Sequence, residues 1–186
     1  MKDRFEICLS GSGGQGLILA GIILAEAAGI HDEKEVVQTQ SYGPEARGGA
    51  SRSEVVISDN TIDYPKVMKS DILLALTQTA CDQYAKNLNN DGILVADSDE
   101  VENISSIPNK KYLFPIAEAA QKEIGTKLVT NIISLGIIVG LTKVVTEEAI
   151  QKAVCSRVPR KAIEINKKAL LLGFDIARDF KQKQNN

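Results

Sequence analysis

A glycine-rich turn near the start of the chain constrains the fold more than any other feature. Residues 11–16 read Gly-Ser-Gly-Gly-Gln-Gly and lie between a strand-like apolar run at 5–10 and a helix-like apolar run at 14–28. A strand that passes through such a turn into a helix leaves backbone N–H groups unpaired at the positive end of the helix dipole. The pattern therefore predicts a strand–turn–helix unit with a phosphate or carboxylate site at the turn.

Short apolar segments alternate with helical patterns through the first two thirds of the chain. A helix capped by Thr77 or Thr79 is predicted to extend to about Leu88. Turns are predicted at 59–60 and 90–92. The predicted strands cover residues 35–40, 53–58, 71–76, 93–97 and 111–114. Nearly all-apolar strands are typical of a sheet covered on both faces, so we predict an α/β fold with a Rossmann-like, doubly wound, mostly parallel sheet.

The longest apolar segment in the C-terminal third is expected to be a buried helix. Residues 131–141 are apolar on every face of a helix, so the helix must lie in the core or under a partner. Gly136 and Gly140 are interpreted as points of close helix packing. Asn131 either caps this helix or faces a ligand crevice, and the cap is the favoured interpretation.

Two more helices are predicted to complete a helical C-terminal portion. Thr146 precedes two glutamates and is predicted to cap the first of them, and the second is expected at roughly 160–180. The chain contains no repeat and no linker long enough to divide it. Residues 1–180 are therefore predicted to form a single domain, followed by a polar tail at 181–186.

The composition excludes several classes of function. Net charge is −2 and aromatic residues make up 4% with no tryptophan, which argues against a nucleic-acid-binding surface. The three cysteines, Cys8, Cys81 and Cys155, are far apart and form neither a metal-binding motif nor a disulfide framework. No signal peptide is evident, and the apolar runs are too short to span a bilayer. A cytoplasmic protein is expected.

The glycine turn meets the G-x-G-x-x-G spacing at Gly11, Gly13 and Gly16. A dinucleotide site would also need an acidic residue at the end of the second strand, but residues 38–40 are Gln-Thr-Gln. A standard NAD ribose contact is therefore not predicted. The glycines either contact an anion or cofactor, which is the favoured interpretation, or only allow the strand and helix to cross closely.

A second candidate segment, residues 41–52, combines turn-forming residues with charged groups. Loops at strand ends build the ligand crevice of such sheets, and Arg47 and Arg52 can each grip a phosphate or carboxylate. The alternative is an ordinary surface loop in which Glu45 pairs with an arginine. The candidate cofactor- or partner-contacting residues are Gly11, Gly13, Gly14, Gln15, Gly16, Tyr42, Gly43, Pro44, Glu45, Arg47, Gly48, Gly49, Ser51 and Asn131.

No catalytic set can be assembled from the sequence. His31 is the only histidine and lies among charged residues, where an exposed, solvated position is expected. Cys8 and Cys155 are interpreted as small buried residues. Without a nucleophile–base pair, paired carboxylates or a metal motif, the isolated chain is expected to be inactive.

Several motifs together resemble one family, the gamma subunits of 2-oxoacid:ferredoxin oxidoreductases. The resemblance covers essentially the whole chain, and its most specific part is the 40–51 segment. The Glu-Ala-Arg-Gly-Gly-Ala-Ser sequence at 45–51 is similar to the 2-oxoglutarate type rather than the pyruvate and ketoisovalerate type. The segments that carry the resemblance are 11–16, 40–51, 53–58, 62–65, 71–76, 130–131 and 135–136.

The resemblance implies a subunit of a multi-chain enzyme. Such a complex converts 2-oxoglutarate to succinyl-CoA with thiamine diphosphate and Mg²⁺ on alpha and beta subunits. Iron–sulfur clusters on a delta subunit pass electrons to ferredoxin or a similar acceptor. The gamma chain would support assembly and contact coenzyme A, binding no cofactor of its own.

Other interpretations remain open at this point. The substrate can be another 2-oxoacid, such as pyruvate, a branched-chain oxoacid or indolepyruvate. The chain can instead be a free-standing nucleotide-binding regulatory module, whereas an independent NAD-dependent dehydrogenase is disfavoured. If the helix at 131–141 is left partly uncovered, the isolated chain is expected to form a homodimer.

Overall fold

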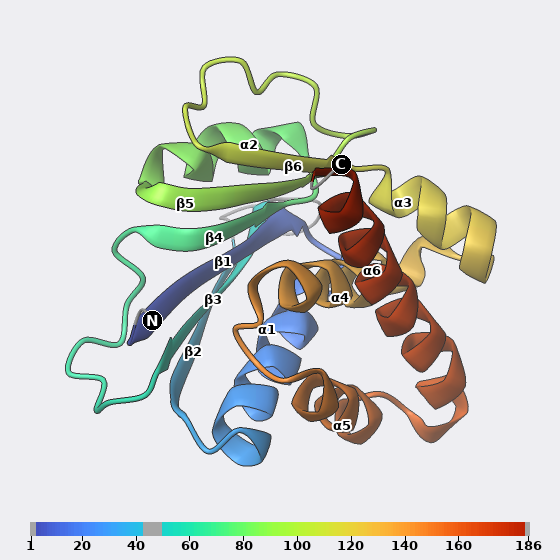
Figure 1. The fold of residues 1–186 in the computed structure, drawn as a ribbon, viewed down its shortest axis with the longest axis horizontal. Coiled ribbons are helices and arrows are strands. Elements are labelled where there is room, and N and C mark those ends of the chain that lie inside the picture. The colour runs from blue at the N-terminus through green and yellow to red at the C-terminus, as the bar shows by residue number, and fades with distance from the viewer. Residues whose placement is uncertain (1–2, 43–49, 185–186) are drawn as a thin grey trace.

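The computed structural model describes residues 3–42 and 50–184 and shows a six-stranded sheet (Figure 1). The strand order is β2-β3-β1-β4-β5-β6. β1, β4, β5 and β6 are parallel, whereas β3 is antiparallel to both of its neighbours. The predicted mostly parallel α/β fold is confirmed. The strands are β1 Arg4–Ser12, β2 Glu35–Tyr42, β3 Ala50–Ser58, β4 Ser70–Ala75, β5 Leu88–Asp97 and β6 Lys110–Phe114.

The antiparallel part of the sheet lies at the N-terminal half of the chain. β2 and β3 pair from Glu35–Ser58 to Tyr42–Ser51, and β3 in turn pairs with the whole of β1. A short connection can join antiparallel strands, whereas a parallel pair needs a long crossover, so β2 and β3 form a hairpin. β2 therefore lies one strand away from β1, unlike the second strand of a dinucleotide-binding fold. An acidic residue at its end would lie away from the glycine turn.

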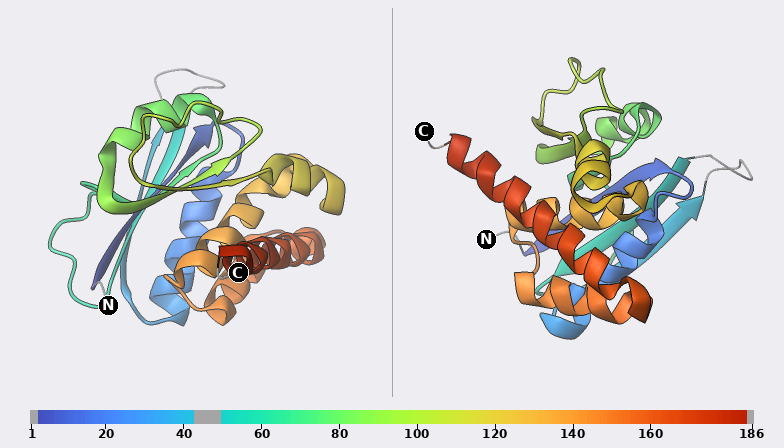
Figure 2. Two further views of the ribbon diagram at one scale, coloured as in Figure 1. Left: turned by 45° about the horizontal axis from the view of Figure 1, so that its top comes forward. Right: turned by 90° about the vertical axis from the view of Figure 1, so that its right-hand side faces the viewer.

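The helices form a thick layer on one face of the sheet and a thin layer on the other (Figures 1 and 2). The larger core cluster includes Ile7 and Leu9 of β1, and the smaller one includes Cys8, which points to the opposite face. α2 covers the side of the smaller cluster. The helices are α1 Leu17–Glu26, α2 Gln78–Tyr84, α3 Ile116–Ala119, α4 Thr130–Thr142, α5 Glu147–Arg157 and α6 Ile163–Gln184.

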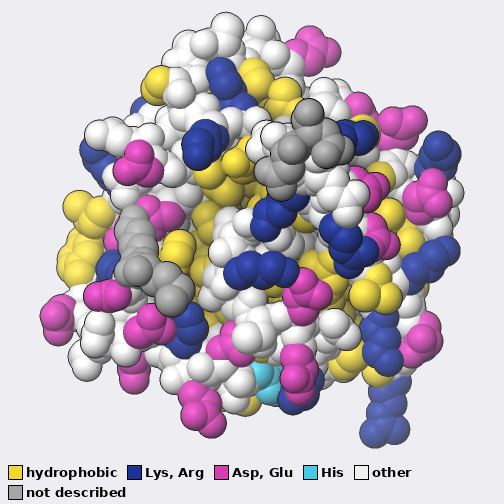
Figure 3. All heavy atoms as spheres, viewed as in Figure 1, with side chains coloured by type: hydrophobic (Ala, Val, Ile, Leu, Met, Phe, Trp, Pro, Cys, Tyr) yellow, Lys and Arg dark blue, Asp and Glu magenta, His cyan; other side chains and the backbone are white. Residues whose placement is uncertain are grey.

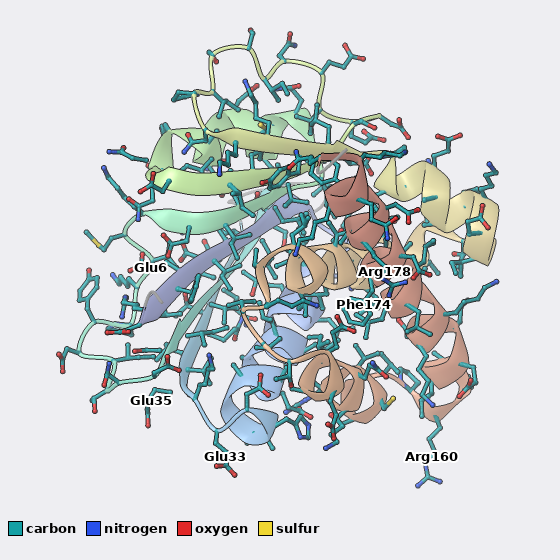
Figure 4. The ribbon with its side chains drawn as sticks, viewed as in Figure 1. Glu6, Glu33, Glu35, Arg160, Phe174 and Arg178 are labelled. Atoms are coloured by element: carbon teal, nitrogen blue, oxygen red, sulfur yellow. The ribbon has the colours of Figure 1, made fainter. Side chains whose placement is uncertain are left out.

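Close contact between α4 and α6 organises the thick layer. Residues 130–140 of α4 are all buried, which confirms the predicted buried helix. A Cβ added at Gly136 would lie 2.9 Å from the Cα of Gly173, and one added at Gly140 would lie 2.6 Å from the Cβ of Ala177. The two α4 glycines thus allow close packing, as predicted. Phe174, labelled on α6 in Figure 4, is 3% exposed. Because α6 covers α4, the premise that α4 would be left partly uncovered is wrong, and homodimer formation by the isolated chain stays a prediction without that support.

Two half-buried side chains of β1 hold the connection between β3 and β4. Arg4 Nη2 donates hydrogen bonds to the carbonyls of Tyr64 (2.9 Å) and Lys66 (3.3 Å). Glu6, labelled in Figure 4, accepts from the backbone N–H of Met68 at 2.6 Å. The connection, which includes the 62–65 motif, therefore has a defined path without regular secondary structure.

On the face shown in Figure 3, side chains of both charge signs are interspersed.

Most helix and strand boundaries agree with those predicted from the sequence, and the predicted N-caps Thr77 and Thr146 are confirmed. The turn predicted at 90–92 lies within β5, which begins at Leu88, but there the pairing with β4 passes from Ser70–Leu88 to Ile72–Ile93, so residues 89–92 bulge out of the ladder. Asn109 Nδ2 holds this bulge by donating to the carbonyls of Asn89, Asn90 and Gly92. The final helix continues to Gln184, beyond the predicted limit. Within it, Lys181 Nζ donates to the carbonyl of Gly140 at 2.9 Å.

Two residues are placed differently from expectation. Cys155 is half-buried, whereas Cys8 is buried as predicted. His31 is half-buried rather than exposed, with 23% of its side chain accessible. α1 continues as a π-helix over Ala27–His31, and the His31 Nε2 atom is buried 3.8 Å from Glu26 Oε1, without a hydrogen-bond partner in the described part of the chain.

Glu26 links the end of α1 to the end of α5. Its side chain is 9% exposed and accepts hydrogen bonds from Ser156 Oγ and Arg157 Nε. Burial alone would raise the pKa of Glu26, but these hydrogen bonds and the Arg157 charge outweigh it. The pKa of the carboxyl therefore lies below its ordinary value of 4.5.

We expect Glu26→Gln to lower the free energy of unfolding at neutral pH by about 1 kcal/mol. Because the folded pKa is depressed, the stabilisation is complete above pH 4.5 and is lost as pH falls through the folded pKa. Urea unfolding of both proteins at pH 7 and at decreasing acid pH measures this difference. Glu164→Gln, at a side chain that is 87% exposed, is the matched control and should change little at any pH. If the difference in free energy of unfolding between Glu26→Gln and the unmodified protein grew as the pH fell, the expectation would be contradicted.

Candidate functional site

The glycine turn and the 41–52 segment lie at the same edge of the sheet. Gly11 of β1 pairs with Ser51 of β3, and Ser51 also pairs with Tyr42 at the end of β2. β4 ends at the same edge, since Ala75 pairs with Ser10. The carboxyl ends of parallel strands form the ligand crevice in open α/β sheets. The fold thus places the described ends of both predicted segments beside one crevice edge.

The turn itself has a conformation that requires glycine. Gly14 has φ +93° and Gly16 has φ +71°, both in the region that L side chains rarely adopt. A Cβ added at Gly14 would meet no atom of residues 3–42 and 50–184 within 4 Å, so this part of the chain leaves that side of the turn open. Gln15 folds back over the turn, where its Oε1 accepts the Ser12 N–H at 2.7 Å. Gln15 therefore stabilises the turn rather than extending into the crevice.

Asn131 packs against this turn, and the interpretation of Asn131 as a helix cap is wrong. α4 is preceded by Val129 as N-cap, without a side-chain cap. Asn131 Nδ2 instead donates to the carbonyl of Gly16 at 3.0 Å. A Cβ added at Gly16 would lie 2.6 Å from Nδ2, so the asparagine amide fills the space beside the glycine. Asn131 lies inside the first turn of α4, and its side chain therefore reaches a neighbouring element rather than its own helix end.

The oxygen of the same amide has no partner. Asn131 is 4% exposed, and its Oδ1 atom is one of three buried side-chain atoms without a hydrogen bond in the described structure. Leaving a buried acceptor unsatisfied costs about 1–3 kcal/mol. Such an atom at a crevice edge is a functional signal that the sequence could not show.

One free helix N-terminus lies at the crevice. Gly16 is the N-cap of α1 and contacts Asn131 in the first turn of α4. α1 has neither a side-chain cap nor an acidic residue in its first turn, whereas α4 continues directly from the 3-10 helix Lys127–Val129, which Thr126 caps. The partial positive charge at the start of α1 is unshielded by carboxylates, and it favours an anion by about 0.3–1 kcal/mol. The site is suited to phosphate groups.

Other predicted residues have different placements. Ser51 is 5% exposed within β3. Arg52 lies on the α2 side, where its guanidinium stacks 5.1 Å from the Tyr84 ring centre and lies 3.3 Å from Glu54 Oε1. The side chain of Tyr42 lies outside the described part of the structure. So do the candidates Gly43, Pro44, Glu45, Arg47, Gly48 and Gly49.

The described residues offer binding groups rather than acid–base chemistry at this edge. Burial, followed by the Glu54 charge, raises the pKa of the Cys8 thiol to about 12. Asp97, at the end of β5, is 1% exposed, and burial raises its pKa above the ordinary value. Its carboxylate accepts the N–H of Ala117 at 2.8 Å and so holds the start of α3. Asp97 was not among the predicted site residues, although a carboxylate that ends an apolar strand is a recognisable signal in the sequence.

Residues 3–42 and 50–184 hold no group of three His, Cys, Asp or Glu side chains that could bind a metal ion. This part of the chain also holds no helix with the length and apolar character needed to cross a bilayer.

Comparison with known protein families matches residues 6–176 to the family described as "Pyruvate ferredoxin/flavodoxin oxidoreductase". The chain belongs to this family. Among curated members it is 47% identical to 2-oxoglutarate synthase subunit KorC of Methanocaldococcus jannaschii, over 96% of this chain and 97% of that subunit. The predicted resemblance to a gamma subunit of the 2-oxoglutarate type is confirmed.

Solved structures place the fold in the same pyruvate ferredoxin/flavodoxin oxidoreductase family. The gamma subunit of a keto/oxoacid ferredoxin oxidoreductase from Geobacter sulfurreducens has a TM-score of 0.85 and 51% identity, covering 94% of this chain and 99% of that one. A 2-oxoglutarate:ferredoxin oxidoreductase from Magnetococcus marinus has a TM-score of 0.85 at 22% identity and shows likeness of fold alone. This chain is matched over 96% of its length and covers 32% of that longer chain.

Proposed function

We propose that this chain is the gamma subunit of a 2-oxoglutarate:ferredoxin oxidoreductase and that its crevice binds the phosphate end of coenzyme A. The observation that carries the second part is the uncapped N-terminus of α1 at Gly16, beside the buried Asn131 Oδ1 atom that has no hydrogen-bond partner among the described residues. In the assembled enzyme, thiamine diphosphate with Mg²⁺ and the iron–sulfur clusters belong to the alpha, beta and delta subunits. The reaction product is succinyl-CoA, and ferredoxin or a similar carrier takes the electrons in the cytoplasm.

Coenzyme A suits the geometry of the crevice. Its diphosphate is a compact, doubly charged group, and backbone N–H groups at a helix N-terminus recognise such groups. The open side of Gly14 lets a ligand approach the turn backbone closely. The chain supplies binding energy and orientation, while the reacting carbonyl is handled on the other subunits. This division of labour agrees with the shortage of proton-transfer groups among the described residues of the crevice.

The choice of 2-oxoglutarate rests on the similarity to KorC. The Magnetococcus marinus enzyme, whose structure has 2-oxoglutarate, coenzyme A and succinyl-CoA bound, contains a domain of the same fold within a longer chain. That arrangement supports a gamma-type domain working against the catalytic domains of its partners.

Co-purification with a tagged form of this chain tests the proposal. We expect a heteromeric complex that contains thiamine diphosphate and iron. Assays with coenzyme A should give the highest kcat/KM for 2-oxoglutarate when compared with pyruvate, 2-oxoisovalerate and indolepyruvate. A colourless chain without partners would favour the regulatory-module interpretation, and a higher kcat/KM for another oxoacid would overturn the substrate assignment.

A further inference from the structure

We infer that Asn131 determines which anions the crevice accepts, because its Oδ1 atom needs a hydrogen-bond donor that the ligand supplies. The favoured ligand is then a phosphate ester that carries an N–H or O–H group beside its phosphates, and a bare phosphate chain is the poorer ligand. This inference rests on the proposed function, since it concerns the same crevice.

The orientation of the Asn131 amide follows from its neighbour. The Gly16 carbonyl is an acceptor and also receives the Ala20 N–H at 3.0 Å, so only the Nδ2 end of the amide can face it. Oδ1 then points away from that carbonyl and has no partner among the described residues. The side chain is 4% exposed, so bulk water does not satisfy the oxygen. A donor at the turn would satisfy it.

The position of the orphan oxygen connects it to the anion site. Asn131 lies in the first turn of the 13-residue α4 and touches the N-cap of the ten-residue α1. The unshielded N–H groups at the start of α1 recognise negative charge, whereas Oδ1 recognises a donor. Coenzyme A combines both features, because the hydroxyl and amide N–H groups of its pantetheine arm follow the diphosphate. Inorganic diphosphate has the charge without those donors.

The test measures coenzyme A and inorganic diphosphate in the assembled complex, after loading with thiamine diphosphate and Mg²⁺. Asn131→Leu keeps the side-chain size and removes the amide. We expect the KM for coenzyme A to rise roughly tenfold, as for one lost hydrogen bond. The Ki of diphosphate, as an inhibitor competitive with coenzyme A, should change less than about twofold, since one buried amide contributes little to a helix-dipole site.

Asn166→Leu is the matched control. Asn166 is also a buried asparagine with one hydrogen bond, from Nδ2 to the carbonyl of Ala162 at 2.8 Å, but it lies in α6. Asn166→Leu should lose about as much stability as Asn131→Leu. It should leave the KM for coenzyme A and the Ki of diphosphate unchanged.

Each result has a defined meaning. Equal weakening of coenzyme A and diphosphate by Asn131→Leu would show that Asn131 only shapes the turn, which overturns the inference and leaves the proposed function standing. Unchanged constants together with a lower Tm would also overturn it, because a trapped water would then satisfy Oδ1. If diphosphate does not compete with coenzyme A in the unmodified complex, the proposed crevice function itself fails.

Discussion

Gly14→Asp is expected to raise the KM for coenzyme A in the assembled complex roughly 100-fold, with kcat at saturating coenzyme A little changed. A Cβ at Gly14 meets no atom of the described residues within 4 Å, so the new carboxylate extends into the open side of the turn rather than into the core. Two like charges about 4 Å apart in a partly buried site repel by up to ~4 kcal/mol, and a tenfold change in affinity corresponds to about 1.4 kcal/mol. Steady-state kinetics with coenzyme A varied measures the effect.

Gly125→Asp separates this effect from backbone strain. Gly125 has φ +89°, close to the +93° of Gly14, and a Cβ there also meets nothing within 4 Å. It ends the π-helix Ala120–Ile124 and is not part of the glycine turn. Both variants should therefore lose similar stability, but only Gly14→Asp should change the KM. Equal KM values for the two variants would exclude the glycine turn from coenzyme A binding.

Gly173→Ala is expected to destabilise the folded chain by roughly 2 kcal/mol, although alanine is the better helix former by about 1 kcal/mol. The added Cβ would lie 2.8 Å from the Cα of Gly136 and 2.9 Å from the backbone N of Ile137. The same Cβ would also clash with the carbonyl oxygen of Ile133. Backbone atoms cannot rotate away, so α4 and α6 must separate and lose part of their packing. Thermal unfolding should show a Tm lower by about 4–8 °C.

Asp179→Ala is the control for helix propensity on the same helix. Asp179 is exposed, so this change adds a good helix former without a clash. Its Tm should equal or slightly exceed that of the unmodified chain. If Gly173→Ala behaves in the same way, the close approach of α4 and α6 is not needed for stability.

Local patterns along the chain predicted much of the fold. The apolar runs at 71–76 and 93–97 form the interior strands β4 and β5. Thr77 caps α2, and Thr146 caps α5, as predicted. These features depend on side-chain alternation and cap chemistry within a few residues. The start of β5 was missed because a bulge at residues 89–92, which Asn109 holds from a later part of the chain, separates Leu88 from the regular pairing that begins at Ile93.

The candidate site was predictable only in part. The glycine turn was recognised because a strand, a turn and a helix follow one another directly. The role of Asn131 was misjudged because its position at the start of an apolar helix matches an N-cap equally well. Whether such a residue caps its own helix or bonds to another depends on where the neighbouring helix lies.

The sequence by itself determined the strand–turn–helix unit, the buried α4 and the membership of the family, since each depends on residue types at short, fixed spacings. Only the tertiary structure decided that β3 lies between β2 and β1, which separates this sheet from a dinucleotide-binding one. It also decided that Asn131 meets Gly16 across 115 residues of chain. Such long-range contacts are selected by the packing of whole helices and strands against one another, and no local pattern encodes them.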